Sequence, residues 1–286
     1  MKSIYWFRND LRVDDNLSLN EAIESSDEIL FVYIQDVKNL NDTEWKFTRM
    51  DSHRKLYISQ GLNALQERLG SYGHSLNYYL GDTVGGLNNL VKKFQIDRIY
   101  CESIDSHEEL DEEKRLRDHK IDLYSLYQSG LFLNDQIPFH LNDLPDVFTK
   151  FRKDIELRNI NPIKPSLVNE KINAIISIVD EESITFNLQQ KDYSKSSFPI
   201  SENRFFGGED KGFKYLEYYF SSNKPATYKK TRNELMGTGF STKFSPWLAT
   251  GYISARQVYD FLLSYESNVT KNESTYWIFF ELLWRE

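Results

Sequence analysis

Hydrophobic and polar positions in the first half of the chain alternate between two periods. Short runs rich in β-branched, aromatic and leucine residues predict strands at residues 4–7, 29–34, 76–80, 98–101 and 123–127. The run at 29–34 is apolar throughout, as expected of a strand buried on both faces. Because helical patterns separate the runs, the sequence predicts right-handed βαβ units and a doubly wound parallel sheet of the Rossmann-like α/β class.

Helical periodicity fills the gaps between these strands. Asp51 is placed to cap a helix that Gly70 ends, and residues 90–94 and 108–116 carry shorter helical patterns. No Gly-x-Gly-x-x-Gly motif follows the first strand run, so the predicted sheet lacks the usual dinucleotide-binding turn.

Residues 129–200 break this alternation. The segment is polar, has few clear periods and contains five prolines: Pro138, Pro145, Pro162, Pro165 and Pro199. We interpret it as a long connector with short helices that crosses the protein surface, and connectors of this length are often functional. The chain is therefore divided into an α/β domain at 1–128, a connector at 129–200 and a helical domain at 201–286.

From residue 205 onwards the pattern becomes helical. Phe213, Leu216 and Phe220 recur at helical spacing, and Ser254 is placed to cap a further helix. A last helix is expected to open at residue 274 or 275, and it reaches residue 286 without a Gly or Pro stop.

That last helix places Trp277, Glu281 and Trp284 on one face, with a carboxylate between two indole rings. No later segment is available to cover this face, so we expect either a partner there or further chain that completes the domain. Two interpretations of Glu281 stay open. It pairs with Arg285 one turn on at a solvent edge, or it accepts hydrogen bonds in a cleft where flat rings stack.

A hydroxyl-rich loop lies between the helical patterns. Ser241, Thr242 and Ser245 surround Lys243 and precede Pro246, which can begin a helix. Such a loop offers O–H donors, N–H donors and a helix N-terminus to an anion such as a diphosphate. The alternative is a capping loop that binds no ligand.

Composition narrows the class of protein. The chain of 286 residues has a net charge of −8, but residues 224–256 carry six Lys or Arg and only one Glu. That basic stretch is either a solvated face or a site for an anionic partner. The single cysteine excludes an internal disulfide and favours a reducing cytoplasm. No apolar run is long enough to span a bilayer, so no membrane partner is expected.

Several stretches resemble the photolyase/cryptochrome family, most closely its DASH cryptochrome branch. They are YWFRNDLRVDDN at 5–16, GGE at 207–209, TYK at 227–229, TRN at 231–233, STKFSPWLA at 241–249, STYW at 274–277 and ELLWRE at 281–286. The resemblance implies an FAD bound in a helical domain that follows the α/β domain. Relatives extend further, so the chain is expected to end within the FAD-binding domain and to bind FAD poorly by itself.

The same resemblance assigns site residues. The FAD phosphates would lie near Tyr228, Ser241, Thr242, Lys243, Phe244 and Ser245, with Arg285 near the flavin. Glu281 and Trp284 match positions that hydrogen-bond to a flipped pyrimidine dimer and stack on it. Family members often carry a folate antenna, 5,10-methenyltetrahydrofolate. Glu102, after the fourth strand, is the candidate contact for it, and the alternative is a surface carboxylate.

In photolyases, reduced flavin absorbs blue light and passes an electron to a cyclobutane pyrimidine dimer in DNA, which then opens. The DASH branch implies single-stranded DNA, for which no unpairing is required. A monomer is expected. Two alternatives stay open, namely a blue-light photoreceptor that signals through a partner without repair, and a flavin-free nucleic-acid-binding remnant. The retained Glu281 and Trp284 favour repair.

Overall fold

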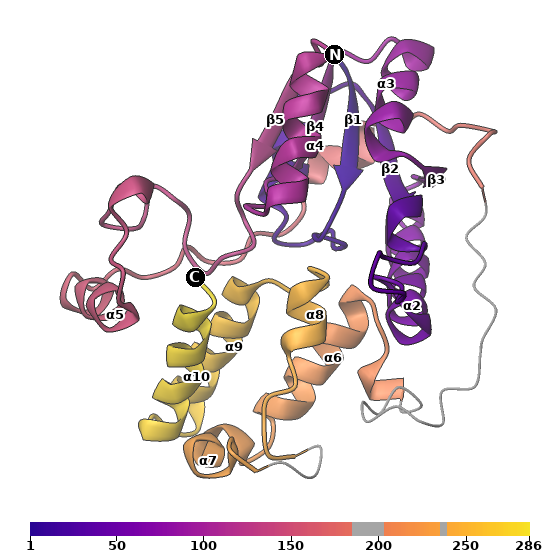
Figure 1. The fold of residues 1–286 in the computed structure, drawn as a ribbon. Coiled ribbons are helices and arrows are strands. Elements are labelled where there is room, and N and C mark those ends of the chain that lie inside the picture. Colours follow the sequence, from indigo (N-terminus) through magenta and orange to yellow (C-terminus); the bar gives the residue numbers. More distant parts are fainter. Residues whose placement is uncertain (185–202, 235–238) are drawn as a thin grey trace.

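Five parallel strands form the centre of the first domain in the computed structural model, which describes residues 1–184, 203–234 and 239–286 (Figure 1). The five strands are β1 Lys2–Phe7, β2 Glu28–Asp36, β3 Leu76–Gly81, β4 Arg98–Glu102 and β5 Leu123–Leu126. A short sixth strand, β6 Ile176–Ser177, pairs with β2. The α-helices are α1 Leu17–Ser25, α2 Ser52–Gly70, α3 Thr83–Phe94, α4 His107–Asp118, α5 Phe148–Leu157, α6 Glu209–Phe220, α7 Lys224–Thr231, α8 Ser245–Ala249, α9 Ala255–Asn268 and α10 Glu273–Trp284. Short 3₁₀ turns are η1 Val37–Asn39, η2 Leu141–Asp143, η3 Glu170–Ala174 and η4 Asn203–Phe205.

The sheet confirms the predicted α/β class. Its order is β3-β2-β1-β4-β5, and every neighbouring pair runs parallel. The register sets Tyr5 between Phe31 and Tyr100 at the middle of the sheet. Strand order reverses on either side of β1, so the loops after β1 and β4 diverge at the carboxyl edge, as in other doubly wound folds.

Alternate residues of β1 and β2 enter two separate cores, which explains why both strands are apolar throughout. Tyr5, Phe7 and Phe31 pack with the buried faces of α1 and α2, whereas Ile4 and Trp6 pack with α3 and α4 on the other side. A strand covered by helices on both faces has no polar side to present. The helix α1, which the sequence pattern did not single out, completes this double cover.

Helix starts follow local capping chemistry. Asp51 caps α2 and Ser254 caps α9, as predicted. The expected start of α10 at 274 or 275 is wrong by one or two residues. Asn272 caps that helix, because its side-chain oxygen accepts the N–H groups of Ser274 and Thr275.

The connector contributes more structure than its pattern predicted. It contains α5, and its β6 adds a parallel pairing to β2 at Glu28 and Ile29. A two-residue strand is too short for a periodic signal, so only the register of the folded sheet reveals it. Pro199, one of the connector prolines, lies outside the described residues. The domain boundaries at 128 and 200 stay predictions.

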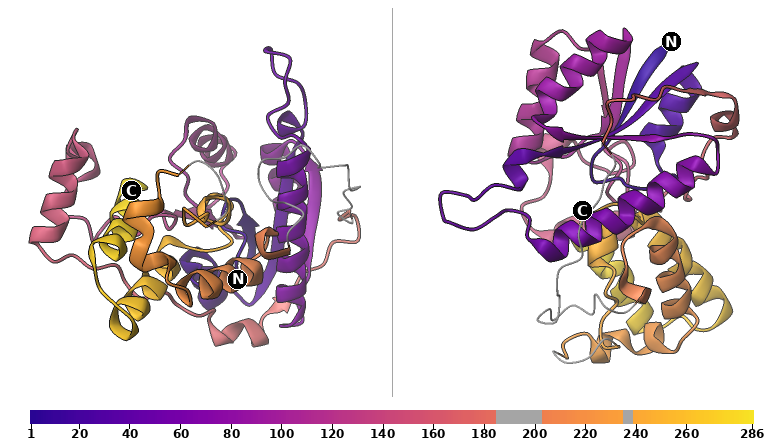
Figure 2. Two further views of the ribbon diagram at one scale, coloured as in Figure 1. Left: turned by 90° about the horizontal axis from the view of Figure 1, so that it is seen from below. Right: turned by 90° about the vertical axis from the view of Figure 1, so that its right-hand side faces the viewer.

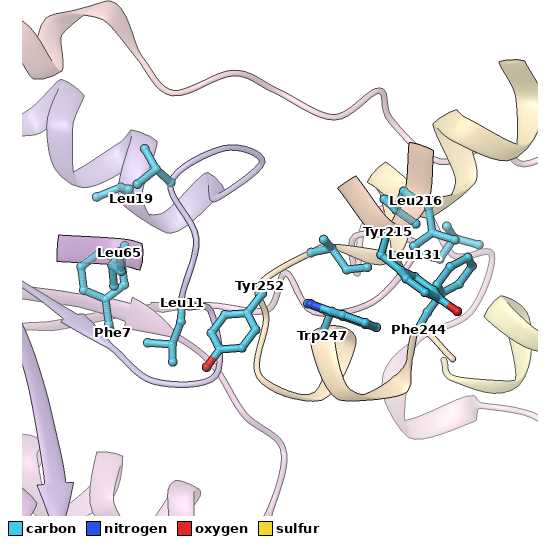
Figure 3. Close-up of a cluster of buried hydrophobic side chains, with 14 of the residues drawn as sticks. Phe7, Leu11, Leu19, Leu65, Leu131, Tyr215, Leu216, Phe244, Trp247 and Tyr252 are labelled. Atoms are coloured by element: carbon cyan, nitrogen blue, oxygen red, sulfur yellow. The ribbon is translucent and has the colours of Figure 1, made fainter. Parts of the chain in front are cut away.

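The carboxyl edge of the sheet meets the helical domain directly, and the core continues across the junction (Figures 1 and 3). Leu11 N–H donates to the carbonyl of Thr250 at 3.3 Å. Gly251 has a φ of +67°, and a Cβ there would lie 1.8 Å from the carbonyl oxygen of Asn9. Only glycine permits this close approach of two backbones. Figure 2 shows α2 running along one flank of both domains.

One ion pair at this junction is completely buried. Arg256 of α9 donates from Nε to Asp15 Oδ2 at 3.0 Å, and both side chains have 0% exposure. The guanidinium also donates to the carbonyls of Gln128 and Gly130. Across the described residues, no helix is long and apolar enough to cross a membrane.

Candidate functional site

The helix α10 carries the first constellation. Its twelve residues set Trp277, Glu281 and Trp284 along one side, as predicted. The indole of Trp284 is 57% exposed, and the carboxylate of Glu281 keeps about a third of its surface, 35%, in contact with solvent. These side chains therefore remain open to a ligand.

Glu281 pairs with Arg232, so the first of its two open interpretations, the pair with Arg285, is wrong. Arg232 follows α7, which packs against α10, and its guanidinium donates to Glu281 Oε1. Arg285 lies past the last turn of α10 and donates instead to the main-chain carbonyls of Ser129 and Leu248. Helical spacing brought Arg285 near, but the neighbouring helix supplies the better-placed cation.

Arg232 joins several groups of the site. Its guanidinium carbon lies 4.4 Å from the ring centre of Trp277, a cation–π contact. Burial, and secondarily the Glu281 carboxylate, raise the pKa of Tyr228, which is mostly buried on α7. With one oxygen held by Arg232, Glu281 Oε2 has no hydrogen-bond partner within the described part of the chain. Glu281 is thus a hydrogen-bond acceptor held in place by Arg232 and still open on one side.

The connector helix α5 covers the adjoining stripe of α10. Phe148 stacks on Trp284 with ring centres 3.8 Å apart and an angle of 17° between the planes. Arg152 Nη1 donates to the hydroxyl of Tyr276 at 2.6 Å, and that hydroxyl donates to Glu156 at 2.5 Å. An earlier part of the sequence therefore packs beside this face, on the side of Trp284 that meets Phe148. The expectation of a partner or of further chain over the rest of the face stays a prediction, because Trp284 is still 57% exposed.

The hydroxyl-rich loop leads into α8. Phe244 is buried against Tyr219 and Phe220, so its ring anchors the loop and only its main chain is left for a ligand. Lys243 has a φ of +58°, and Pro246 lies in the first turn of the helix. Thr231 Oγ1 donates to the Phe240 carbonyl at 2.9 Å, which ties the loop to α7.

The polar groups of this loop are available. Ser241, Thr242 and Lys243 are half-buried and Ser245 is exposed. In the described ranges none of their side chains has a hydrogen-bond or ion-pair partner. The hydroxyls of Ser241 and Thr242 and the ammonium of Lys243, without partners among the described residues, are suited to bind an anionic group. A loop whose only role is capping would not need them. The side chain of Ser245 does not cap α8.

Glu102, the candidate antenna contact, is in a different environment. It ends β4 with 0% exposure, so the alternative of a surface carboxylate is wrong. Neither carboxylate oxygen has a hydrogen-bond partner among the residues that the structure describes. Burial, reinforced by the negative charge of Asp10, raises the pKa of Glu102 to about 8, although Arg12 and Arg8 oppose the shift.

Sequence reasoning missed two residues of the α10 site, Arg232 and Phe148. Arg232 lies four residues after Tyr228, so helical spacing places both near one face of α7 and could have drawn attention to it. For Phe148 no comparable signal exists. It lies 136 positions before Trp284, and its stacking depends on how the connector folds back.

Comparisons with known proteins agree with this fold. The family model for DNA photolyase matches residues 3–167. The chain is 33% identical to the DASH cryptochrome of Idiomarina loihiensis over 99% of this chain and 61% of that protein. It is 34% identical to the chloroplastic/mitochondrial DASH cryptochrome of Arabidopsis thaliana over 99% of this chain and 51% of that protein.

Solved structures agree as well. A cryptochrome from Synechocystis matches the whole chain with a TM-score of 0.89 at 32% identity, and the match covers 60% of that structure. A bacterial class III photolyase from Agrobacterium tumefaciens, 20% identical with a TM-score of 0.73, supports the fold alone. The chain thus spans between about half and three fifths of the length of the curated relatives named here.

Proposed function

The chain belongs to the DNA photolyase family, and from this premise we propose that it takes part in FAD-dependent, blue-light-driven repair of cyclobutane pyrimidine dimers in single-stranded DNA. One observation carries the proposal. An open indole, Trp284, and a carboxyl acceptor, Glu281, lie along one side of α10, and Arg232 holds the acceptor in place. Flat, hydrogen-bonding ligands such as pyrimidines need both features.

Each side chain has a separate task in this proposal. Trp284 stacks on a pyrimidine ring, an interaction worth about 1–3 kcal/mol per base. Glu281 Oε2 accepts a hydrogen bond from a ring N–H or from a protonated carbonyl oxygen of the dimer. Arg232 keeps Glu281 oriented, because its guanidinium donates a hydrogen bond to Glu281 Oε1.

The loop residues fit the phosphates of FAD. Ser241, Thr242 and Lys243 offer donors that lack partners in the described structure, and Ser245 opens α8 beside them. Tyr228 presents its hydroxyl from α7, and Arg285 would lie near the flavin. When bound, FAD would supply light absorption and electron transfer. The chain itself would hold the phosphates, exclude water and orient the dimer.

The residues present do not fit a folate antenna at Glu102. A pterin needs an accessible carboxylate, but the side chain of Glu102 is fully buried. Its pKa of about 8, which Arg12 and Arg8 lower only in part, also favours the neutral form at neutral pH. We derive no step through 5,10-methenyltetrahydrofolate. Binding of this cofactor to the purified chain, with loss of binding in Glu102→Gln, would restore the assignment.

Single-stranded DNA is favoured by the distribution of charge. The net charge is −8, which weakens long-range attraction to duplex DNA. Lys150 and Lys153 of α5 and Arg158 just after it are exposed, and none has an ion-pair partner among the described residues. The same helix begins with Phe148, which stacks on Trp284. We also propose a monomer, because α5 of the same chain packs beside α10 and supplies the ring that stacks on Trp284. A cytoplasmic location is proposed from the single, buried cysteine.

Illumination of the chain with saturating FAD and a reductant, on single-stranded oligonucleotides that carry one thymine dimer, tests the proposal. We expect dimer opening under blue light, no opening in the dark, and slower opening on a duplex. Binding of the oligonucleotide without any opening would favour a signalling photoreceptor. Failure to bind flavin at any concentration would favour the flavin-free remnant. A titration of the chain with FAD checks the expectation of poor FAD binding. A dissociation constant in the micromolar range or below would contradict it.

A further inference from the structure

We propose that Phe148 of α5 is a positioning residue for Trp284: it fixes one face of the indole so that the exposed remainder is held ready to stack on a base. This inference rests on the proposed function, since it assumes that Trp284 stacks on a nucleic-acid base. It adds the connector helix to the site and gives that helix a specific task.

The geometry is that of an L-shaped aromatic bracket. Phe148 lies nearly parallel to Trp284, with ring centres 3.8 Å apart and 17° between the planes. Phe280 stands edge-on to both rings, 5.3 Å from Phe148 at 84° and 6.4 Å from Trp284 at 70°. One face and one edge of the indole are therefore occupied, yet 57% of Trp284 remains exposed.

Trp284 needs such support because most of it is open to solvent, with 57% exposure. A mostly exposed indole samples several rotamers, and binding a base would then require ordering the ring first. A parallel aromatic ring on one face removes that freedom in advance.

Phe148 is itself held firmly. It is the first residue of α5, and three contacts fasten that helix to α10. Arg152 donates to the hydroxyl of Tyr276, the same hydroxyl donates to Glu156, and the Arg152 guanidinium lies 5.5 Å from the ring of Phe280. Arg152 and Glu156 lie one and two turns after Phe148 on the same helix, so these polar contacts set the position of its ring.

The stripe on α10 explains why one residue serves both sides. Tyr276, Phe280 and Trp284 face α5, whereas Trp277 and Glu281 face Arg232. Trp284 lies at the edge of the α5 stripe that adjoins the other stripe, so a ring that Phe148 holds from one side remains next to Glu281. A base stacked on Trp284 would then come within reach of Glu281.

The test labels all five tryptophans with 5-fluorotryptophan in the full chain and follows them by fluorine NMR. The signal that is missing in Trp284→Phe belongs to Trp284. The variants are Phe148→Leu, which removes the ring, Phe148→Tyr, which keeps it, and Phe139→Leu. Phe139 stacks on Phe151 of α5, with ring centres 5.9 Å apart. It makes no ring contact with Trp284 in the described structure, so Phe139→Leu is the matched control.

We expect Phe148→Leu to shift the Trp284 signal and to weaken dark binding of a single-stranded, thymine-dimer oligonucleotide about 3- to 10-fold, the range for loss of one aromatic pair. Phe148→Tyr and Phe139→Leu should stay within about twofold of the wild type. If Trp284→Leu loses affinity but Phe148→Leu does not, or binds more tightly, the positioning role is overturned while the proposed function stands. If Trp284→Leu binds as the wild type does, the stacking function fails, and this inference fails with it.

Discussion

The pairs Asp15–Arg256 and Glu281–Arg232 both join an arginine of the helical domain to a carboxylate from another element, yet their surroundings differ. Asp15 and Arg256 have 0% exposure, and the remaining donors of Arg256 are directed at main-chain carbonyls. Glu281 and Arg232 keep 35% and 28% of their side chains exposed, and one oxygen of Glu281 has no partner in the described residues.

The difference separates a structural pair from a binding pair. A charge taken fully out of water must have every hydrogen-bonding group satisfied, which leaves nothing for a ligand. A half-open pair loses less solvation and can keep one acceptor unused. The Asp15–Arg256 pair therefore fastens two domains, whereas the Glu281–Arg232 pair prepares an acceptor beside a stacking surface.

The largest expected effect is at the buried pair. Asp15→Asn removes the charge but suits the left-handed backbone at this residue, where φ is +51°. Because Arg256 would be left buried without its counter-charge, we expect the free energy of unfolding to fall by about 3–5 kcal/mol. Urea unfolding measures this, with Glu281→Gln as the half-open control, expected within about 1 kcal/mol of the wild type. A loss below 1 kcal/mol for Asp15→Asn would remove the contrast between the pairs.

The second effect concerns Glu102, a buried carboxyl group with no hydrogen-bond partner among the described residues. The pKa of Glu102 is raised from 4.5 to about 8 by burial, so between these pH values the folded chain keeps a proton that the unfolded chain has released. Stability should therefore fall as pH rises from 4.5 to 8, by up to about 5 kcal/mol, since one pKa unit corresponds to about 1.4 kcal/mol.

Glu102→Gln should remove this fall, and unfolding curves at several pH values would show it. Glu209, with a pKa raised to about 7 by burial, adds a fall in the same direction. The contribution of Glu102 is thus the difference between the wild type and Glu102→Gln, which is clearest between pH 7 and 8. Parallel curves for the two proteins would contradict the assignment.

The third effect is functional and lies at the half-open pair. With flavin bound, Glu281→Ala should lower repair per absorbed photon by one to two orders of magnitude, because a charge-assisted hydrogen bond is worth about 1.5–3 kcal/mol. Flavin content should stay nearly unchanged. Trp284→Ala should instead weaken dark binding of the oligonucleotide. Loss of flavin from Glu281→Ala would make the residue a support for the cofactor.

The smallest effect is on the exposed cations of α5. Lys150→Gln and Lys153→Gln should each weaken binding of a single-stranded oligonucleotide about threefold and reduce the dependence of affinity on salt by about one counterion. Lys214→Gln on α6, which already pairs with Asp210, is the control. Equal effects of all three variants would indicate a general charge effect, and α5 would then be no part of the binding surface.

Local patterns were sufficient for much of the fold. Each of the five predicted strand runs became a strand of the parallel sheet, because alternating and continuous apolar runs report directly on burial. The caps Asp51 and Ser254 were also found, since a cap depends on residues within one turn. At the start of α10 the expected opening at residue 274 or 275 was wrong, because Asn272 caps the helix.

The candidate site was predicted only in part. The face with Trp277, Glu281 and Trp284 follows from helical spacing alone. The partner of Glu281 does not, because Arg232 comes from another helix and its approach depends on how α7 packs against α10. The burial of Glu102 was likewise hidden, since a carboxylate in a sequence gives no sign of the helices that will cover it.

The sequence by itself determined the five main strands, the caps Asp51 and Ser254 and the stripe on α10, because these depend on periodicity and on neighbours within a few residues. The tertiary structure alone decided which charges are buried and which stay open. Asp15 meets Arg256 across 241 positions, and Phe148 meets Trp284 through the fold of the connector. Desolvation and stacking depend on what surrounds a group from all directions, and that information exists only after the chain has packed.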